Sequence, residues 1–238
     1  MTAVLVTGAS RGLGRAIASS FAVDGARVGL VARDAARLDA VAAETGGVAL
    51  VADVCDPEAL AHAAARFGTP DALVLAAGIP GPTAPLWEIS LEDWEATVAA
   101  NLTGVFLTCR AFLPGMVERA RGSVVVIGSM TGKRPLPGRT PYAAAKTGLI
   151  GFVRTLAWDA GPHGVRVNLV SPGPVEGERL DAVLAAQGAG ARQAFTTASP
   201  LARFAADADV VAAVRFLCSD VSITGEDLNV SAGTVMHG

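Results

Sequence analysis

The chain carries little charge, and that charge is nearly balanced. Only 17% of its 238 residues are charged, the formal net charge is -3, and the isoelectric point is near 5.6. A nucleic-acid ligand would call for a concentrated basic face, which this composition does not favour. The first residues carry no basic side chain, and their apolar run is too short for a signal peptide or a membrane span. We therefore expect a soluble cytoplasmic protein whose partner is a small molecule rather than nucleic acid or membrane.

Cysteine is scarce as well. Cys55, Cys109 and Cys218 are scattered along the chain, form an odd number and include no C-x-x-C pair. Disulfide frameworks use even sets of cysteines, and thiolate metal sites use closely spaced ones. We expect no disulfide and no metal site, and we predict that all three cysteines pack in the interior of a protein from a reducing compartment.

Tyrosine and lysine are rarer still. The chain has one tyrosine, Tyr142, and its 19 basic residues include only two lysines, Lys133 and Lys146. Nevertheless Tyr142 and Lys146 stand four positions apart. In a sequence that otherwise avoids both residue types, this spacing marks the two residues as candidates for a chemical role.

Apolar segments, by contrast, are abundant and regularly spaced. Hydrophobic residues make up 51% of the chain, enough for the core of one α/β domain over residues 1–238. Short β-type runs alternate with longer amphipathic stretches, a pattern typical of a parallel sheet covered by helices on both faces. The expected strands are Ala3–Thr7, Arg27–Ala32, Val48–Ala52, Ala72–Ala76, Ser123–Gly128, Val165–Val170 and Asp227–Val230. The expected helices are Gly12–Asp24, Ala35–Thr45, Pro57–Phe67, Leu91–Arg119 with a break near Asn101, Tyr142–Ala160 and Asp207–Ser219.

The segment 174–203 departs from this alternation. It shows no clear periodicity and is rich in glycine, alanine and proline. Long irregular insertions in compact domains are usually functional lids or disordered segments, and we interpret this one as a substrate lid. The fold class expected from the whole pattern is a Rossmann-type, doubly wound α/β domain with a seven-stranded parallel sheet.

A glycine-rich turn follows the first expected strand and leads into a helix. It reads Gly8-Ala9-Ser10-Arg11-Gly12-Leu13-Gly14. Glycines there allow a tight turn and a close approach to a pyrophosphate, whose charge the N–H groups of the helix N-terminus can meet. The strand–turn–helix context favours a dinucleotide. A nucleoside-triphosphate loop is disfavoured because the G-K-[ST] signature is missing.

The end of the second expected strand bears on the choice of dinucleotide. Arg33 closes this strand, where an arginine can pair with the 2′-phosphate of NADP and an acidic residue would bind the ribose hydroxyls of NAD. Arg11 can add a second cation. We therefore expect NADP(H) to be preferred, with NAD(H) possible because Asp34 follows directly. The alternative is that Arg33 is only a solvent-exposed residue at the start of the next helix.

The fifth expected strand and the helix after it carry the candidate chemistry. Ser129 stands at the end of the strand, where its hydroxyl could bond a substrate oxygen, and the helix carries Tyr142 and Lys146. Positions four apart share a helix face, so the phenol and the ammonium point into the same space. A cation beside a phenol stabilises the phenolate and lowers the phenol pKa, as a general acid–base requires.

With these motifs the sequence resembles a classical short-chain dehydrogenase/reductase over nearly its whole length. By that resemblance Tyr142 is the proton donor, Lys146 lowers its pKa and holds the nicotinamide ribose, Ser129 orients the substrate carbonyl, and Asn101 anchors a water chain behind Lys146. The resemblance also implies a homotetramer packed partly through the Leu91–Arg119 and Tyr142–Ala160 helices. Further cofactor contacts that it implies are Asp53, Val54, Ala76, Ala77, Gly78, Pro172, Gly173 and Val175.

The chain departs from the family pattern at two places near the expected site. Ala76-Ala77-Gly78 replaces the usual N-A-G, so an asparagine side chain that bonds within the sheet is missing. Glu176-Gly177 stands where a threonine often contacts the cofactor. Neither change removes a residue of the expected catalytic set.

These features predict an NADPH-dependent oxidoreductase that reduces a ketone or aldehyde. Two alternatives remain open: NAD-dependent oxidation of a secondary alcohol or diol, and a catalytically silent dinucleotide-binding regulator. The expected pocket borders are mostly apolar and favour an apolar or aromatic carbonyl compound. They are Ile79–Trp87, Met130–Arg139 and Pro174–Arg203, with the arginines Arg134, Arg139, Arg179 and Arg192.

Overall fold

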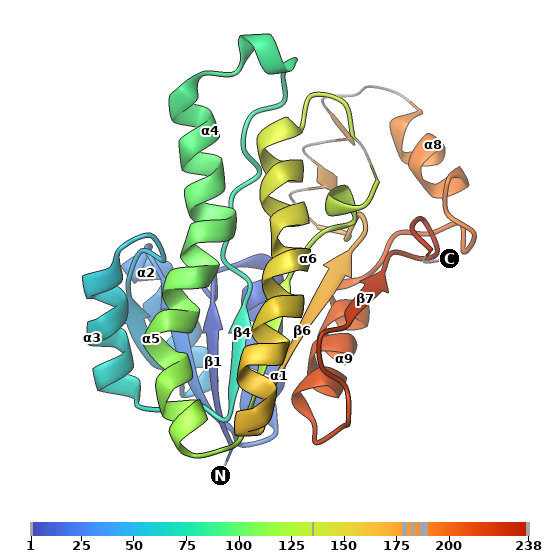
Figure 1. The fold of residues 1–238 in the computed structure, drawn as a ribbon. Helices are drawn as coiled ribbons and strands as arrows, with labels where there is room; N and C mark the ends of the chain where they lie inside the picture. Colours follow the sequence, from blue (N-terminus) through green and yellow to red (C-terminus); the bar gives the residue numbers. More distant parts are fainter. Residues whose placement is uncertain (1, 135, 178–179, 182–183, 186–189, 237–238) are drawn as a thin grey trace.

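The computed structural model describes residues 2–134, 136–177, 180–181, 184–185 and 190–236 (Figure 1). Within these residues seven strands form one sheet in the order β3-β2-β1-β4-β5-β6-β7, and every neighbouring pair is parallel. The strands are β1 (Ala3–Thr7), β2 (Arg27–Ala32), β3 (Val48–Val51), β4 (Ala72–Leu75), β5 (Gly122–Ile127), β6 (Val165–Pro172) and β7 (Asp227–Val230). The expected seven-stranded parallel sheet is confirmed.

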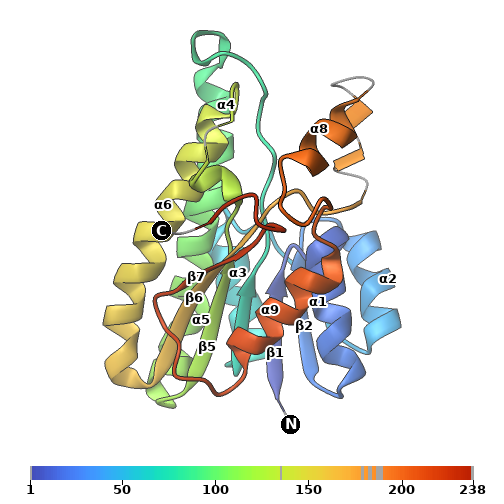
Figure 2. The ribbon, with the colours of Figure 1, turned by 90° about the vertical axis from the view of Figure 1, so that its right-hand side faces the viewer.

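Helices cover both faces of the sheet (Figures 1 and 2). One face carries α1 (Gly12–Val23), α2 (Ala35–Thr45) and α9 (Asp207–Cys218). The opposite face carries α3 (Pro57–Phe67), α5 (Gly104–Glu118) and α6 (Thr140–Ala160). Further described helical segments are η1 (Leu86–Glu88), α4 (Leu91–Val98), η2 (Ala99–Thr103), η3 (Met130–Gly132), η4 (Gly161–His163) and α8 (Ala191–Thr197). The doubly wound arrangement expected from the sequence is therefore confirmed.

The two cores follow from the alternation of side chains along each strand. In β1, Leu5 packs into the cluster under α3, α5 and α6, whereas Val4 and Val6 pack into the cluster under α1, α2 and α9. Successive strand side chains point to opposite faces, so a sheet covered on both sides needs apolar residues at consecutive positions. All five residues of β1 are buried, as this rule requires.

Most expected elements lie within two residues of the observed ones, and the differences have local causes. β6 continues to Pro172 because Ser171 and Pro172 pair with β7. α6 begins at Thr140, with Pro141 in its first turn, where proline is tolerated. The break expected near Asn101 is the π-helical segment η2 between α4 and α5. α8 lies inside the segment that showed no clear periodicity.

The cysteines behave in two ways. Cys109 is buried in one core and Cys218 packs against the other, and burial raises the pKa of both thiols to about 12. Cys55 is exposed, so the prediction that all three pack inside is wrong for this residue. It lies in the turn after β3, where its backbone N–H donates to the Asp53 carboxylate.

One helical run in the described part of the chain, Leu91–Glu118, is long and apolar enough to span a bilayer by length and composition. Its α5 portion buries Val105, Cys109, Phe112 and Met116 in the core beneath it. Such an apolar stripe is what a helix packed on a sheet requires. Packing against the sheet thus accounts for the buried apolar stripe of α5.

Lys133, one of the two lysines, forms a buried ion pair with the last strand. Its Nζ lies 2.7 Å from Asp227 Oδ2, and the two side chains are 9% and 5% exposed. The same ammonium donates to the Asn229 side chain. Because Lys133 directly follows η3, the pair fastens the segment after β5 to β7.

Lys133→Met should lower the free energy of unfolding by about 3–5 kcal/mol, because Asp227 would become an unpaired buried carboxylate. The double variant Lys133→Met/Asp227→Leu should recover most of this loss, since apolar replacement of a whole buried pair is often close to neutral. Urea unfolding of the wild type and both variants measures the two effects. A single variant as stable as the wild type, or a double variant no better than the single one, would contradict the role of the pair.

Candidate active site

The predicted site residues gather at one edge of the sheet. Parallel strands bring their carboxyl ends to the same edge, and the strand order reverses between β1 and β4, where doubly wound folds bind their ligands. α4 and the N-terminal part of α6 project beyond this edge (Figure 1). The residues at or after the strand ends are Gly8–Gly14 (β1), Arg33 (β2), Asp53–Val54 (β3), Ala76–Gly78 (β4), Ser129 (β5) and Pro172–Gly173 (β6).

Each glycine of the first turn meets a different steric demand. Gly8 has φ +70°, and an ideal Cβ on it would lie 2.9 Å from Ala77 Cα. A Cβ on Gly14 would lie 2.3 Å from the Gly8 carbonyl oxygen, so this glycine lets α1 pack against the turn. Gly12 has φ +52° and no described atom within 4 Å of an ideal Cβ, which leaves open space beside the backbone.

The start of α1 offers its N–H groups to a ligand. Arg11 occupies the N-cap with extended backbone and makes no side-chain capping bond in the described structure. Arg11 is exposed, Ser10 is half-buried, and Leu13 packs against the core under α1. Uncapped N–H groups at a helix N-terminus bind anions, and the open backbone at Gly12 permits close approach. This turn therefore fits a dinucleotide pyrophosphate.

Arg33 and Asp53 meet at the ends of β2 and β3. Arg33 Nη1 lies 3.5 Å from Asp53 Oδ2, and the Arg33 side chain is 69% exposed. Asp34, by contrast, caps the N-terminus of α2. Its carboxylate accepts the Arg37 N–H at 3.1 Å and lies 3.3 Å from Arg37 Nε. Thus an exposed cation and a carboxylate already engaged in capping stand where the adenosine ribose is expected.

Val54 is held by close packing, and the turn after β4 is held by hydrogen bonds. A Cβ on Gly104 of α5 would lie 2.7 Å from Val54 Cγ2, so the loop after β3 rests on that glycine. The Thr7 hydroxyl accepts the N–H groups of Ala76 and Ala77, each at 3.1 Å. Thr7 therefore ties β1 to the end of β4, at the turn where the family asparagine is missing.

Asn101 is buried within η2 and 0% exposed. Its Nδ2 donates to the carbonyls of Ile79 and Thr97 at 3.0 and 2.9 Å. Its Oδ1 accepts no hydrogen bond from the described residues, and buried acceptors normally have a partner. The amide can thus accept a bond from an ordered water or a ligand.

Asn101 and Lys146 converge on Gly78. An ideal Cβ there would lie 2.5 Å from Asn101 Oδ1 and 3.9 Å from Lys146 Nζ. A side chain at Gly78 would therefore fill the space between the amide and the ammonium.

Tyr142 and Lys146 share the buried face of α6, as their spacing predicted. They are 7% and 5% exposed, and Lys146 Nζ lies 5.7 Å from the Tyr142 ring centre. Lys146 Nζ also donates to the Ile127 carbonyl oxygen at 2.8 Å, at the end of β5. The structure thus brings the ammonium, the phenol ring and the end of β5 together.

Ser129 lies just beyond that strand end. Its Oγ accepts the Thr131 N–H at 3.1 Å and caps η3. A hydroxyl that accepts one bond can still donate its own hydrogen. The bond from Thr131 thus orients the Ser129 hydroxyl, which can still donate its hydrogen to an acceptor such as a substrate oxygen.

Beyond β6 the chain is fastened to neighbouring segments. The Gly173 N–H donates to the Val230 carbonyl at 2.9 Å, and a Cβ on Gly173 would lie 2.9 Å from Ser231 Cα. Val175 forms a parallel bridge with Ala205. Gly177, in the place of the family threonine, has φ +135°, and its carbonyl accepts the N–H groups of Leu180 and Asp181. A positive φ of this kind favours glycine at position 177.

The predicted lid at 174–203 is described only in part, and Arg179 lies outside the described residues. Within the described part, Leu180, Leu184 and Phe204 form a small apolar cluster against Phe195 of α8. Arg192 lies 3.1 Å from Asp181. The lid remains a prediction.

Two contacts at the site escaped the sequence reasoning. Nothing in the sequence marks the Ile127 carbonyl as the partner of Lys146, because every residue carries a carbonyl. The sequence predicts Arg139 only as part of the pocket border, yet its Cζ lies 5.1 Å from the Tyr142 ring centre. Its position one helical turn before Tyr142 is the signal that could have indicated this contact.

Comparison with known proteins covers nearly the whole chain. A family model described as enoyl-(acyl carrier protein) reductase matches residues 8–235. D-threitol dehydrogenase of Mycolicibacterium smegmatis is 39% identical over an alignment of 249 residues. The alignment covers 96% of this chain and 91% of that protein. The 3-oxoacyl-[acyl-carrier-protein] reductase of Escherichia coli is 37% identical, and the alignment covers 98% of this chain and 96% of that protein.

Solved structures agree. A 3-oxoacyl-[acyl-carrier protein] reductase from Brucella melitensis matches with a TM-score of 0.93 at 34% identity, covering 99% of this chain and 92% of that chain. A second such reductase from the same organism, with bound NAD, matches with a TM-score of 0.89 at 35% identity, with the same coverage. These matches confirm the resemblance found in the sequence. The chain is an NAD(P)-dependent oxidoreductase acting on CH–OH groups or the corresponding carbonyls, and it belongs to the short-chain dehydrogenase/reductase family.

Proposed function

We propose that this enzyme reduces a ketone or aldehyde to an alcohol with NADPH, and that Tyr142 supplies the proton. The observation that carries this proposal is the buried pairing of the Tyr142 ring and the Lys146 ammonium at the carboxyl edge of the sheet. A phenol held beside a cation is suited to general acid–base work.

Residues around the glycine turn would hold the cofactor. The N–H groups from Gly8 to Gly14 would bind the pyrophosphate, Arg33 and Arg11 the 2′-phosphate, and Asp53 and Val54 the adenine side. The turns after β4 and β6 would flank the nicotinamide half through Ala76, Ala77, Gly78, Pro172, Gly173 and Val175. When bound, the reduced nicotinamide supplies the hydride to the carbonyl carbon.

The chain's own residues would then carry the proton chemistry. The Ser129 hydroxyl donates to the carbonyl oxygen and polarises it. Tyr142 Oη passes its proton to the same oxygen, so the new C–H and O–H bonds complete the alcohol and leave a tyrosinate. Lys146 stabilises that tyrosinate and binds the nicotinamide ribose. Asn101 Oδ1, which accepts no bond from the described residues, would hold a water through which the proton is replaced.

The reverse reaction is the second candidate. The relative from M. smegmatis is named a D-threitol dehydrogenase, which favours oxidation of a diol. The same residues serve either direction, because the acid of the reduction is the base of the oxidation. Screening carbonyl compounds with NADPH and NADH, and alcohols with NADP and NAD, separates the two candidates.

We also propose a cytoplasmic homotetramer. Exposed apolar side chains on the two helices expected to pack support the assembly: Trp158 of α6 is 83% exposed and Phe106 of α5 is 47% exposed. Large exposed apolar side chains on one face are typical of protein interfaces. The mass of the purified chain in solution tests this assembly, which a monomer would contradict.

Arg33→Ala should weaken NADPH binding roughly tenfold to a hundredfold, the value of a lost hydrogen-bonded charge contact, while NADH binding should stay nearly unchanged. Arg66→Ala is the matched control, because Arg66 lies in the last turn of α3, which leads into the opposite edge of the sheet. Titration of each protein with both cofactors measures the effect. Equal loss of NADPH and NADH binding, or a wild type that prefers NADH, would remove Arg33 from the phosphate site.

Tyr142→Phe should bind the cofactor as the wild type does but lose turnover by about a hundredfold or more, because the proton donor is gone and the glycine turn is untouched. The measurement is cofactor absorbance during turnover of a substrate found in the screen, with cofactor titration as the binding control. Near-normal turnover by the variant would reject Tyr142 as the acid. A wild type that binds cofactor but turns over nothing across the screen would favour the silent regulator.

A further inference from the structure

Arg139 places a second cation against Tyr142. It occupies the N-cap position of α6, and its Cζ lies 5.1 Å from the Tyr142 ring centre, compared with 5.7 Å for Lys146 Nζ. Both cations are within the range of a cation–π contact. The ring of Tyr142, a residue that is 7% exposed, therefore lies near an ammonium and a guanidinium in the described structure.

The guanidinium is held in place by the loop after β4. Arg139 Nη1 donates to Thr83 Oγ1 at 2.8 Å, and Nη2 donates to the Pro80 carbonyl at 2.6 Å. Backbone contacts support this arrangement. The Ala84 N–H donates to the Gly138 carbonyl at 3.1 Å, and Gly138 has φ +73°, a conformation that favours glycine. Arg139 is thus fixed relative to the ring by two hydrogen bonds that it donates to a second chain segment.

Helix stability does not account for an arginine at this place. The N-terminus of a helix carries a partial positive charge, and a cation beside it is unfavourable. Lys146 on the same helix adds further positive charge near Arg139. A tyrosinate at Tyr142, in the first turn of α6, would instead be favoured by all three positive groups.

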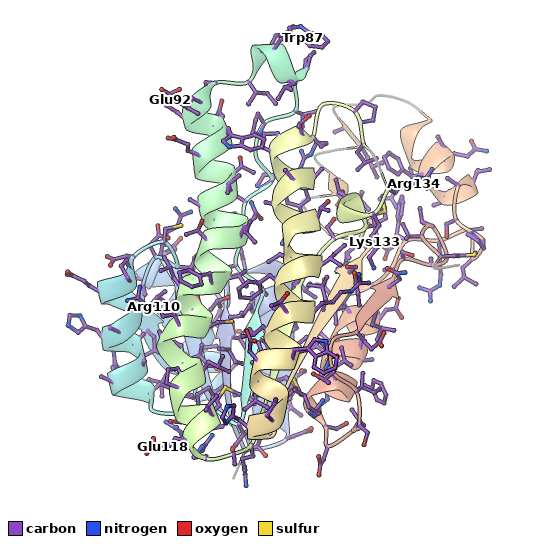
Figure 3. All side chains as sticks on the ribbon, in the orientation of Figure 1. Trp87, Glu92, Arg110, Glu118, Lys133 and Arg134 are labelled. Carbon is purple, nitrogen blue, oxygen red and sulfur yellow. The ribbon has the colours of Figure 1, made fainter. Side chains whose placement is uncertain are left out.

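Other charged groups on the neighbouring elements are engaged elsewhere or exposed. After η3, Lys133 pairs with Asp227, and Arg134 Nη1 lies 3.5 Å from the Thr234 carbonyl. Figure 3 shows both side chains on the β7 side of α6. On α4, the acidic residues Glu92, Asp93 and Glu95 are exposed. Lys146 and Arg139 each place a cation near the ring, at 5.7 and 5.1 Å from its centre.

We propose that Arg139 is a positioning residue which, together with Lys146, stabilises the tyrosinate form of Tyr142. This inference rests on the proposed function of Tyr142 as the acid. In the reduction, Tyr142 Oη gives its proton to the carbonyl oxygen and becomes negatively charged, and a proton from water later restores the phenol. Arg139 favours the charged form over the neutral ring it already contacts, without touching the substrate, and this difference eases the proton transfer.

The test uses the fact that Tyr142 is the only tyrosine, so tyrosinate ultraviolet absorbance in the folded protein reports one residue. Arg139→Gln should raise its ionisation midpoint by about one pH unit, the size expected for one charge at this range in a partly screened site. Arg139→Lys, which keeps the charge, should stay near the wild type. Arg66→Gln, the charge-matched control on α3, should leave the midpoint unchanged.

Activity gives a second readout. The pH profile of kcat/KM for Arg139→Gln should shift in the same direction and by the same amount as the absorbance midpoint. Circular dichroism confirms folding of each variant. If Arg139→Gln does not fold, Arg139→Met, which keeps the apolar stem over the ring, carries the test.

Two results would overturn the inference. One is a midpoint in folded Arg139→Gln or Arg139→Met equal to that of the wild type. The other is an Arg139→Lys midpoint raised as far as that of Arg139→Gln, because the loop contact rather than the charge would then be responsible. The absorbance titration of Tyr142 needs no turnover. The role of Arg139 and the role of Tyr142 as the acid can therefore be rejected by different measurements. Normal turnover by Tyr142→Phe would reject the proposed function even if the midpoint moves.

Discussion

The site depends on one buried contact, the hydrogen bond from the Lys146 ammonium to the carbonyl of Ile127. Lys146 is 5% exposed, and burying its ammonium is costly unless hydrogen bonds compensate for the lost hydration. Ile127 is the last residue of β5, so this bond joins α6 to the carboxyl edge of the sheet. The bond thereby fixes the position of α6 relative to the end of β5. It also fixes the position of Tyr142, which lies one turn earlier on the same face of α6.

The rest of the carboxyl edge is arranged around that contact by backbone approach rather than by long side chains. Gly8 and Gly14 let the first turn pack closely, Gly78 leaves room between Asn101 and Lys146, and Thr7 ties β1 to β4. Charges then follow a simple order along this edge. The exposed cations Arg33 and Arg11 lie at the β1–β2 end, whereas the cations of Lys146 and Arg139 lie beside the phenol ring.

The sequence sufficed wherever the signal was local. The strands, the glycine turn and the shared face of Tyr142 and Lys146 follow from periodicity, strand–turn–helix context and a spacing of four. Long-range partners carried no such signal: Lys133 with Asp227, Arg139 with the loop at Thr83, and Lys146 with a backbone carbonyl. The prediction of a buried Cys55 is wrong because the scarcity of cysteine says nothing about whether a residue in a turn is exposed. The extension of β6 depends on its pairing with β7, which residues far along the chain supply.

The most direct test of this account is the ionisation of Tyr142 with oxidised cofactor bound at saturation. If the buried ammonium tunes the phenol, Tyr142 should ionise well below the usual tyrosine value of about 10, and Lys146→Met should raise the midpoint. The variant must be folded and titrated at saturating cofactor, because lost ribose binding would mimic a lost charge. A midpoint near 10 in the saturated, folded wild type would contradict the account and reduce Lys146 to a ribose ligand.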